Sequence, residues 1–84
     1  MNDSRQRLKG LALSDTGFLF DPITGHMYTL NRTGSEILKW LRDGIPEHFL
    51  PGRIAELFDV TEDEAERDCA AFLKLLHEFR LLEA

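Results

Sequence analysis

The spacing of apolar residues changes near Leu30, and this change limits the folds that the chain can adopt. Before Leu30, short apolar runs at residues 11–13 and 18–20 are separated by polar residues, as they are in β-strands. After Leu30, Ile37 and Leu41 lie on one stripe at the spacing of a helix. The chain is therefore predicted to adopt an α+β fold in which strands come first and helices follow.

A five-residue segment, DPITG at residues 21–25, separates the second apolar run from an alternating run at residues 26–30. Pro22 suits the first central position of a turn, Asp21 can accept a hydrogen bond from the backbone that follows, and Gly25 accepts a positive φ. Two runs joined by such a loop predict a β-hairpin. With the first apolar run as a further strand, the predicted sheet has three short strands.

Three helices are expected after the sheet. Either Asn31 or Thr33 can cap the first of them, and residues 43–44, Asp-Gly, are typical of its end. A turn over residues 46–50 then precedes a short second helix, which holds Pro51 in its first turn because a proline is tolerated there.

The last helix has the clearest pattern. Thr61 and Glu64 form a capping box at its start. A continuous apolar stripe follows, made of Ala65, Cys69, Phe72, Leu76 and Phe79. Leu73 and Leu75 widen this stripe, which predicts packing on more than one side of the helix.

The composition limits the class of protein. The 84 residues allow one domain, residues 1–84, of which residues 1–7 are expected to be a disordered tail. A single cysteine, no signal-peptide pattern and no apolar run near the roughly 20 residues of a membrane span predict a cytoplasmic protein. The net charge is −5, and residues 54–84 carry nine acidic and three basic side chains. This acidic third disfavours a nucleic-acid partner, and its plainest interpretation is a solvated helix face.

The sequence offers little catalytic chemistry. His26, His48, His77 and Cys69 have no spacing typical of a zinc site. Cys69 lies on an apolar helix stripe, where a cysteine usually behaves as a small hydrophobe. No serine lies in a Gly-x-Ser-x-Gly turn. We therefore predict that the chain is not an enzyme and needs no cofactor or metal.

A sheet of three strands has two edges, and each edge presents unpaired backbone N–H and C=O groups. An extended peptide can add a strand to an edge that lies beside a helix, with alternate side chains entering the groove between them. Residues 26–30 are a candidate edge because they lead directly into the helices. The alternative for these side chains is an ordinary place in the core. This alternative is favoured for Leu30, Phe72 and Leu76, and it stays open for His26 and Tyr28.

Much of the sequence resembles a known family. Residues 18–34, FLFDPITGHMYTLNRTG, contain an apolar strand, Asp-x-x-Thr-Gly, an aromatic strand and Leu-Asn-x-Thr-Gly, in the order typical of the PqqD family. Residues 58–61, FDVT, and the apolar pattern of the last helix fit the same family, so the resemblance covers the chain from about Leu8. Residues 11–15 and 20–22 also resemble the branch that is associated with HPr-kinase-related proteins.

This resemblance implies a winged-helix-like fold, with a three-stranded antiparallel sheet followed by three helices. It also implies a peptide-binding chaperone for the leader of a ribosomally made precursor peptide. The leader would add as a strand beside the third strand, rest against the third helix, and be presented to a modifying enzyme, often a radical SAM protein. The implied peptide-binding residues are His26, Met27, Tyr28 and Thr29 on the strand, and Asp68, Cys69, Phe72 and Leu76 on the helix. Pro51-Gly52 departs from the family's unbroken second helix, so a reshaped region is expected there.

Two other functions stay open from the sequence. A DNA-binding winged helix belongs to the same fold class, although the acidic third of the chain speaks against it. A docking subunit would instead recruit a partner enzyme through its acidic helix face without binding a peptide. We expect no nucleic-acid or membrane partner. The chain is either a monomer or a homodimer, since an exposed edge strand can pair with its own copy.

Overall fold

The computed structural model describes residues 5–82. Three short strands and the helices after them confirm the predicted α+β fold with a three-stranded antiparallel sheet, but a short helix that was not predicted precedes the strands. In chain order the elements are α1 (Gln6–Lys9), β1 (Ala12–Leu13), β2 (Phe18–Phe20), β3 (Met27–Thr29), α2 (Arg32–Arg42), the 3-10 turn η1 (Glu47–Phe49), α3 (Leu50–Phe58) and α4 (Glu62–Glu78). Within residues 5–82, no helix is long and apolar enough to cross a membrane.

The strands lie in the order β1-β2-β3, and both pairings are antiparallel. The predicted hairpin joins β2 to β3, and its loop closes where the Gly25 N–H donates to the Asp21 carbonyl at 2.7 Å. Gly25 has a φ of 79°, a conformation that favours glycine. The sheet's outer face exposes Phe18, Phe20 and Met27. This topology leaves β3 at one edge of the sheet.

The helix boundaries follow local signals in the sequence. Asn31 caps α2, because its side-chain oxygen accepts from the Gly34 N–H at 2.7 Å, and this settles the choice between Asn31 and Thr33. Thr61 caps α4 as predicted, accepting from the Glu64 N–H at 3.1 Å. Pro51 lies in the first turn of α3, as expected from its missing N–H.

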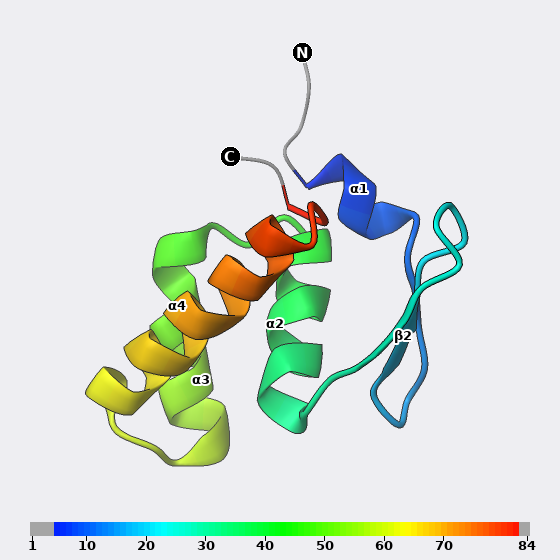
Figure 1. Cartoon of the computed structure of the whole chain (residues 1–84). Coiled ribbons are helices and arrows are strands. Elements are labelled where there is room, and N and C mark those ends of the chain that lie inside the picture. Colours follow the sequence, from blue (N-terminus) through cyan, green and yellow to red (C-terminus); the bar gives the residue numbers. More distant parts are fainter. Residues whose placement is uncertain (1–4, 83–84) are drawn as a thin grey trace.

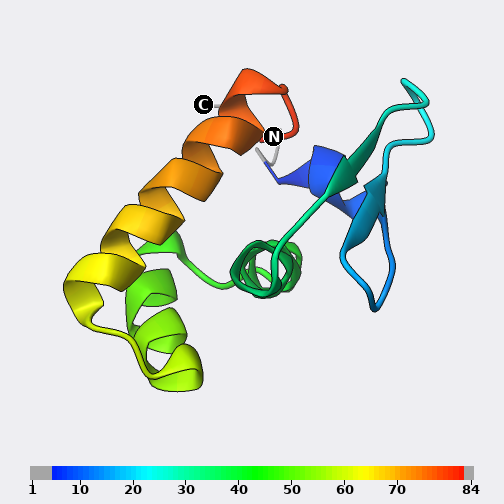
Figure 2. The same ribbon diagram turned by 60° about the horizontal axis from the view of Figure 1, so that its bottom comes forward.

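One hydrophobic core lies between the sheet and the helices. Figure 2 shows α2 end-on, with the sheet on one side and α3 and α4 on the other. The helices α1, α3 and α4 all contact this central helix (Figure 1). The buried apolar residues are Leu8, Leu11, Leu19, Ile37, Leu38, Leu41, Leu50, Ile54, Ala65, Cys69, Leu76, Leu81 and Leu82. The core therefore joins α1, β2 and the helices α2, α3 and α4, and Tyr28 of β3 packs against it from the sheet.

The predicted disordered tail over residues 1–7 is wrong for residues 5–7, and residues 1–4 lie outside the described part of the chain. Arg5 donates to the backbone carbonyls of Leu41 and Ile45 at 3.2 and 2.6 Å. Arg7 donates both ends of its guanidinium to the carboxylate of Asp21, at 3.3 and 2.7 Å. These long-range contacts hold Arg5 and α1 against the end of α2 and the hairpin.

The Arg7–Asp21 ion pair stabilises the fold only while Asp21 is ionised, so this contribution to stability is lost in acid. Asp21 is 1% exposed, and the hydrogen bonds from Arg7 hold its pKa below the ordinary 3.8, although burial acts in the opposite direction. Because the folded pKa is lowered, the stabilisation is fully present above about pH 4 and is lost as the pH falls through the folded pKa.

We expect Asp21→Asn to lower the melting temperature at pH 7 and to weaken its decrease toward pH 3, because Arg7 loses its counter-ion. Thermal melts by circular dichroism at both pH values measure this. Asp15→Asn, at an exposed aspartate, is the matched control and should melt like the wild type. Equal melting of Asp21→Asn and wild type at pH 7 would contradict the account.

Candidate functional site

The hydrogen bonds between β2 and β3 determine which backbone groups of β3 are free. Leu30 donates its N–H to the Gly17 carbonyl at 2.7 Å, and Asp21 donates its N–H to the His26 carbonyl at 2.9 Å. In an antiparallel ladder, hydrogen-bonded pairs alternate with pairs that are not hydrogen-bonded. Leu19 and Tyr28 face each other midway between these bonds, so the N–H and C=O of Tyr28 point toward β2.

Met27 and Thr29 occupy the alternate positions of β3. Their N–H and C=O groups therefore point away from β2, toward a side of β3 on which no strand lies among residues 5–82. Edge groups of this kind are a template for another strand. The outer edge of β3 thus offers two donors and two acceptors from only two residues.

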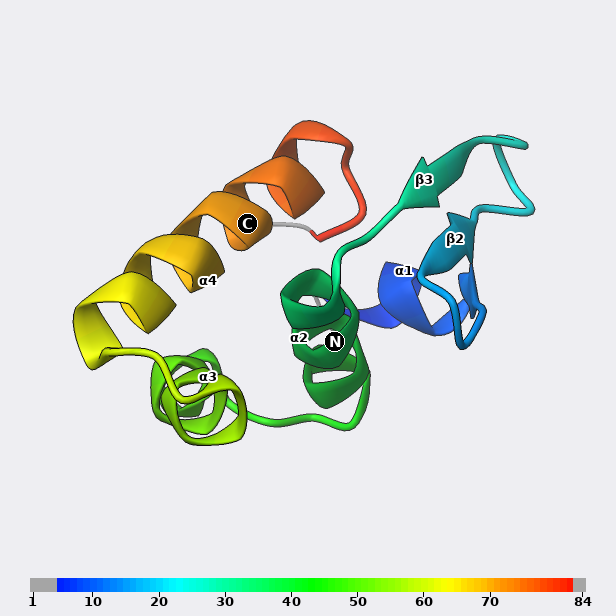
Figure 3. The same ribbon diagram turned by 90° about the horizontal axis from the view of Figure 1, so that it is seen from below.

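An apolar groove lies beside this edge, between β3 and α4. The C-terminal half of α4 runs alongside β3 in Figure 3. The ring centroids of Phe79 and Tyr28 lie 5.1 Å apart, so the end of α4 contacts β3 through these two side chains. The groove has a volume of about 340 Å³ and is lined by Leu19, Tyr28, Thr29, Leu30, Phe72, Leu75, Leu76, Phe79 and Leu81. We call this surface the β3–α4 groove.

Two large apolar side chains in the β3–α4 groove are open to solvent. Leu75 is 47% exposed and Phe79 is 51% exposed, although both lie beside buried neighbours. Exposed apolar area of this kind stabilises a complex when a ligand covers it, by roughly 25 cal/mol for each Å² removed from water. The groove therefore presents an apolar surface that the apolar side chains of a ligand can cover.

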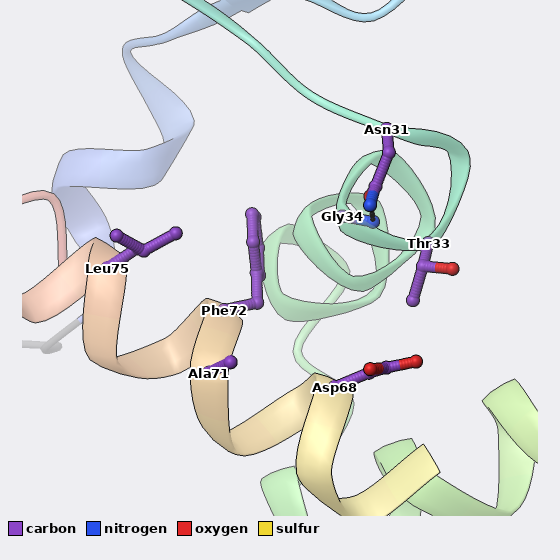
Figure 4. A pocket seen from close by; sticks show the side chains of 7 residues that line it. All are labelled: Asn31, Thr33, Gly34, Asp68, Ala71, Phe72 and Leu75. Carbon is purple, nitrogen blue, oxygen red and sulfur yellow. Dashed lines mark hydrogen bonds between the residues drawn. The ribbon is translucent and has the colours of Figure 1, made fainter. Parts of the chain in front are cut away.

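A second hollow, of about 200 Å³, continues the groove toward the start of α2. It shares Phe72 and Leu75 with the β3–α4 groove, but its other walls are mostly polar. Figure 4 shows the Phe72 ring standing between Leu75 on one side and Thr33 and Asp68 on the other. We call this hollow, lined also by Asn31, Gly34 and Ala71, the polar end of the groove.

Phe72 takes its position because Gly34 has no side chain. A Cβ added at Gly34 would lie 3.0 Å from the Phe72 ring and 3.2 Å from the capping oxygen of Asn31. Both distances are shorter than ordinary van der Waals contacts, so the ring or the cap must move. The glycine therefore allows α4 to approach the start of α2, and this approach forms the wall between the two hollows.

Replacing a glycine by alanine inside a helix usually raises the free energy of unfolding, but we expect no such increase for Gly34→Ala. At Gly52, where an added Cβ meets nothing within 4 Å, alanine should stabilise the fold by about 0.5–1 kcal/mol. Gly34→Ala should give no such gain and should shift the Phe72 ring signals. Urea unfolding and aromatic NMR spectra of both variants measure this. An equal gain at both positions with unmoved Phe72 signals would contradict the packing described here.

The structure brings together four of the eight residues that the family resemblance implies for the site. Tyr28, Thr29, Phe72 and Leu76 all line the β3–α4 groove. Asp68 lines the polar end instead, next to Phe72. The interpretations of Phe72 and Leu76 as core or as groove both hold, since each packs against the core and also lines the groove.

The other three implied residues take different positions. His26 is exposed just before β3, with its ring 6.3 Å from that of Tyr28. Met27 is 62% exposed, and the alternation of β3 turns its side chain to the outer face, so only its backbone faces the edge. Cys69 is 3% exposed, belongs to the core and lines neither hollow. Burial, with a smaller effect of Asp68, raises the pKa of its thiol.

Sequence reasoning did not assign Leu75, Phe79, Asn31 and Thr33 to the site. Leu75 and Phe79 were visible as apolar positions on the last helix, three and seven residues after Phe72, which places all three on one face. Their exposure was the missing information, because periodicity does not separate a core stripe from a groove stripe. Within residues 5–82, no group of three or more His, Cys, Asp or Glu side chains could hold a metal ion.

Comparisons with known proteins agree with this geometry. The chain is similar to a solved structure described as "Lasso peptide synthetase B1 complexed with the leader peptide", with 32% sequence identity, a TM-score of 0.69 and 81% of each chain covered. A comparison with curated proteins finds no match. The family model for "Coenzyme PQQ synthesis protein D (PqqD)" matches residues 16–82, which include β2, β3 and all of the groove's residues. The chain therefore belongs to the PqqD family.

Proposed function

We propose that the chain is a recognition element that binds the leader segment of a ribosomally made precursor peptide. The observation that carries this proposal is the free edge of β3 beside the exposed apolar β3–α4 groove. The similar solved structure, which is described as a complex with a leader peptide, supports it. The same edge and groove give a small domain a binding site without a deep pocket.

The leader would add to the sheet as a fourth strand. Its backbone would exchange hydrogen bonds with Met27 and Thr29, the two residues whose polar groups face outward. Because side chains alternate along a strand, every second leader residue would point into the groove toward Phe72, Leu75 and Phe79. Backbone pairing would supply affinity that does not depend on sequence, and the groove would select apolar side chains.

The bound leader would hold the precursor for a modifying enzyme that acts elsewhere on the same peptide. The recognition element itself would contribute binding and no bond-making step. A radical SAM protein is one proposed partner, following the family resemblance, and the cytoplasm is the proposed location. The segment at residues 11–15 supports a proposed place in the branch associated with HPr-kinase-related proteins.

Titration of a fluorescently labelled leader tests this proposal. The probe is the leader of the precursor peptide encoded beside the protein, and a scrambled version of the same peptide is the control. We expect saturable one-to-one binding of the leader, weak or no binding of the scrambled peptide and no binding of duplex DNA. If the protein associated with the modifying enzyme but bound no leader, a docking subunit would replace the proposed function.

A further inference from the structure

We infer that Asp68 makes the polar end of the groove a site for a cationic side chain of the bound peptide. This inference rests on the proposed function and narrows its substrate class. The preferred peptide would carry Lys or Arg at a fixed spacing from an apolar residue seated in the β3–α4 groove. Asp68 would then determine specificity, while the apolar groove supplies most of the affinity.

The position of Asp68 is the first support. Asp68 lies on α4 one turn before Phe72, and its carboxylate and the Thr33 hydroxyl lie on the same side of the Phe72 ring (Figure 4). The two hollows share Phe72 and Leu75, so a peptide that fills the apolar part continues past Asp68. A Lys or Arg stem can lie along these apolar side chains while its charged head reaches the carboxylate.

The charge balance of the polar end is the second support. Among the residues that line this hollow, Asp68 alone carries a formal charge. Within residues 5–82 it forms no ion pair, in contrast to Asp21 and Glu36. The start of α2 would favour an anion, but its positive end amounts to about half a charge, and the Gly34 N–H already donates to Asn31. The full negative charge of Asp68 therefore outweighs the helix end, and the polar end favours a positively charged ligand side chain.

The spacing follows from strand geometry. Leader residues that face the groove recur at every second position, about 7 Å apart. Phe72 and Leu75 line both hollows, so a leader residue seated against Phe79 and Tyr28 and a leader residue at the polar end would lie on the same face of the strand, one or two such repeats apart. The cationic residue is therefore expected two or four positions from an apolar residue, on the same face of the leader strand.

Selection from a phage-displayed library of random linear peptides tests this inference. The full chain, Asp68→Lys and Glu66→Lys serve as immobilised baits. Glu66 is the matched control, because it is an exposed acidic residue two positions from Asp68, which places it on another face of α4. We expect wild type and Glu66→Lys to enrich Lys or Arg two or four positions from an apolar residue. Asp68→Lys should enrich Asp or Glu there instead.

Synthetic peptides then measure the size of the effect. Replacing the selected Lys by Gln should weaken binding to wild type by about fivefold at low salt, because the ion pair is partly solvated. The same replacement should leave binding to Asp68→Asn unchanged. Added salt should reduce the difference between the two peptides.

Two failures are distinguishable. If apolar residues are enriched without any charge preference, or if wild type and Asp68→Lys select the same charges, the inference about Asp68 is wrong and the proposed function stands. If the wild type enriches no peptide over the bare support, the proposed function fails, and the inference fails with it.

Discussion

Replacing Leu75 by glutamate is expected to abolish leader binding and to leave the fold intact. Leu75 lines both the β3–α4 groove and its polar end, so any peptide strand on β3 must cover it. A carboxylate buried beneath an apolar peptide side chain loses its hydration, and the groove's apolar walls offer it no partner. Together with the lost apolar contact, this should cost about 3 kcal/mol, or more than about a hundredfold in Kd.

The fold should tolerate Leu75→Glu because the side chain is 47% exposed in the free protein. Leu57→Glu is the matched control, since Leu57 is 54% exposed on α3 and lines neither hollow. Circular dichroism establishes folding of both variants, and fluorescence anisotropy measures their binding of the leader. A folded Leu75→Glu variant that binds like the wild type would place the peptide elsewhere on the surface.

Replacing Thr29 by proline is expected to weaken leader binding by about tenfold or more. Proline removes the Thr29 N–H, which points away from β2, and it places ring atoms where the leader strand would pair. The loss of one backbone hydrogen bond costs about 1.5 kcal/mol. The β2–β3 ladder does not use this N–H, so proline is tolerated here as on other edge strands.

Thr29→Val separates this backbone effect from the loss of the side chain. Valine keeps the N–H and the branched shape of threonine, so Thr29→Val should bind the leader like the wild type. Both variants are compared by anisotropy after their near-UV spectra have shown native packing. Equal binding by the folded proline and valine variants would mean that the leader does not pair with the outer edge of β3.

Local signals in the sequence accounted for most of the fold. The Asp21–Gly25 loop, the caps at Asn31 and Thr61, and the place of Pro51 each depend on residues within a few positions, and the structure has all of them. The α1 segment escaped prediction because its evidence is long-range. Arg7 binds Asp21, which lies fourteen residues further along the chain. A helix of four residues is also too short to produce a recognisable apolar period.

The sequence predicted which two elements form the candidate site, the third strand and the last helix, but it predicted fewer of the residues that line it. Strand order and the wide apolar stripe of α4 pointed to an edge and a helix. Cys69 and Leu75 both belong to that stripe or its margins, but only the packing of α4 shows that Cys69 faces the core and Leu75 faces solvent. Burial of one helix face depends on residues far apart in the sequence, so periodicity alone cannot assign it.

Residue-resolved hydrogen exchange by NMR tests the central claim, addition of the leader as a strand on β3, most directly. In the free protein, the Tyr28 amide should be protected by its bond to β2, while the Met27 and Thr29 amides exchange rapidly. On saturation with the leader, Met27 and Thr29 should both become protected, and Leu75 and Phe79 signals should shift. Protection that leaves Met27 and Thr29 unchanged while the leader is bound would contradict strand addition at this edge.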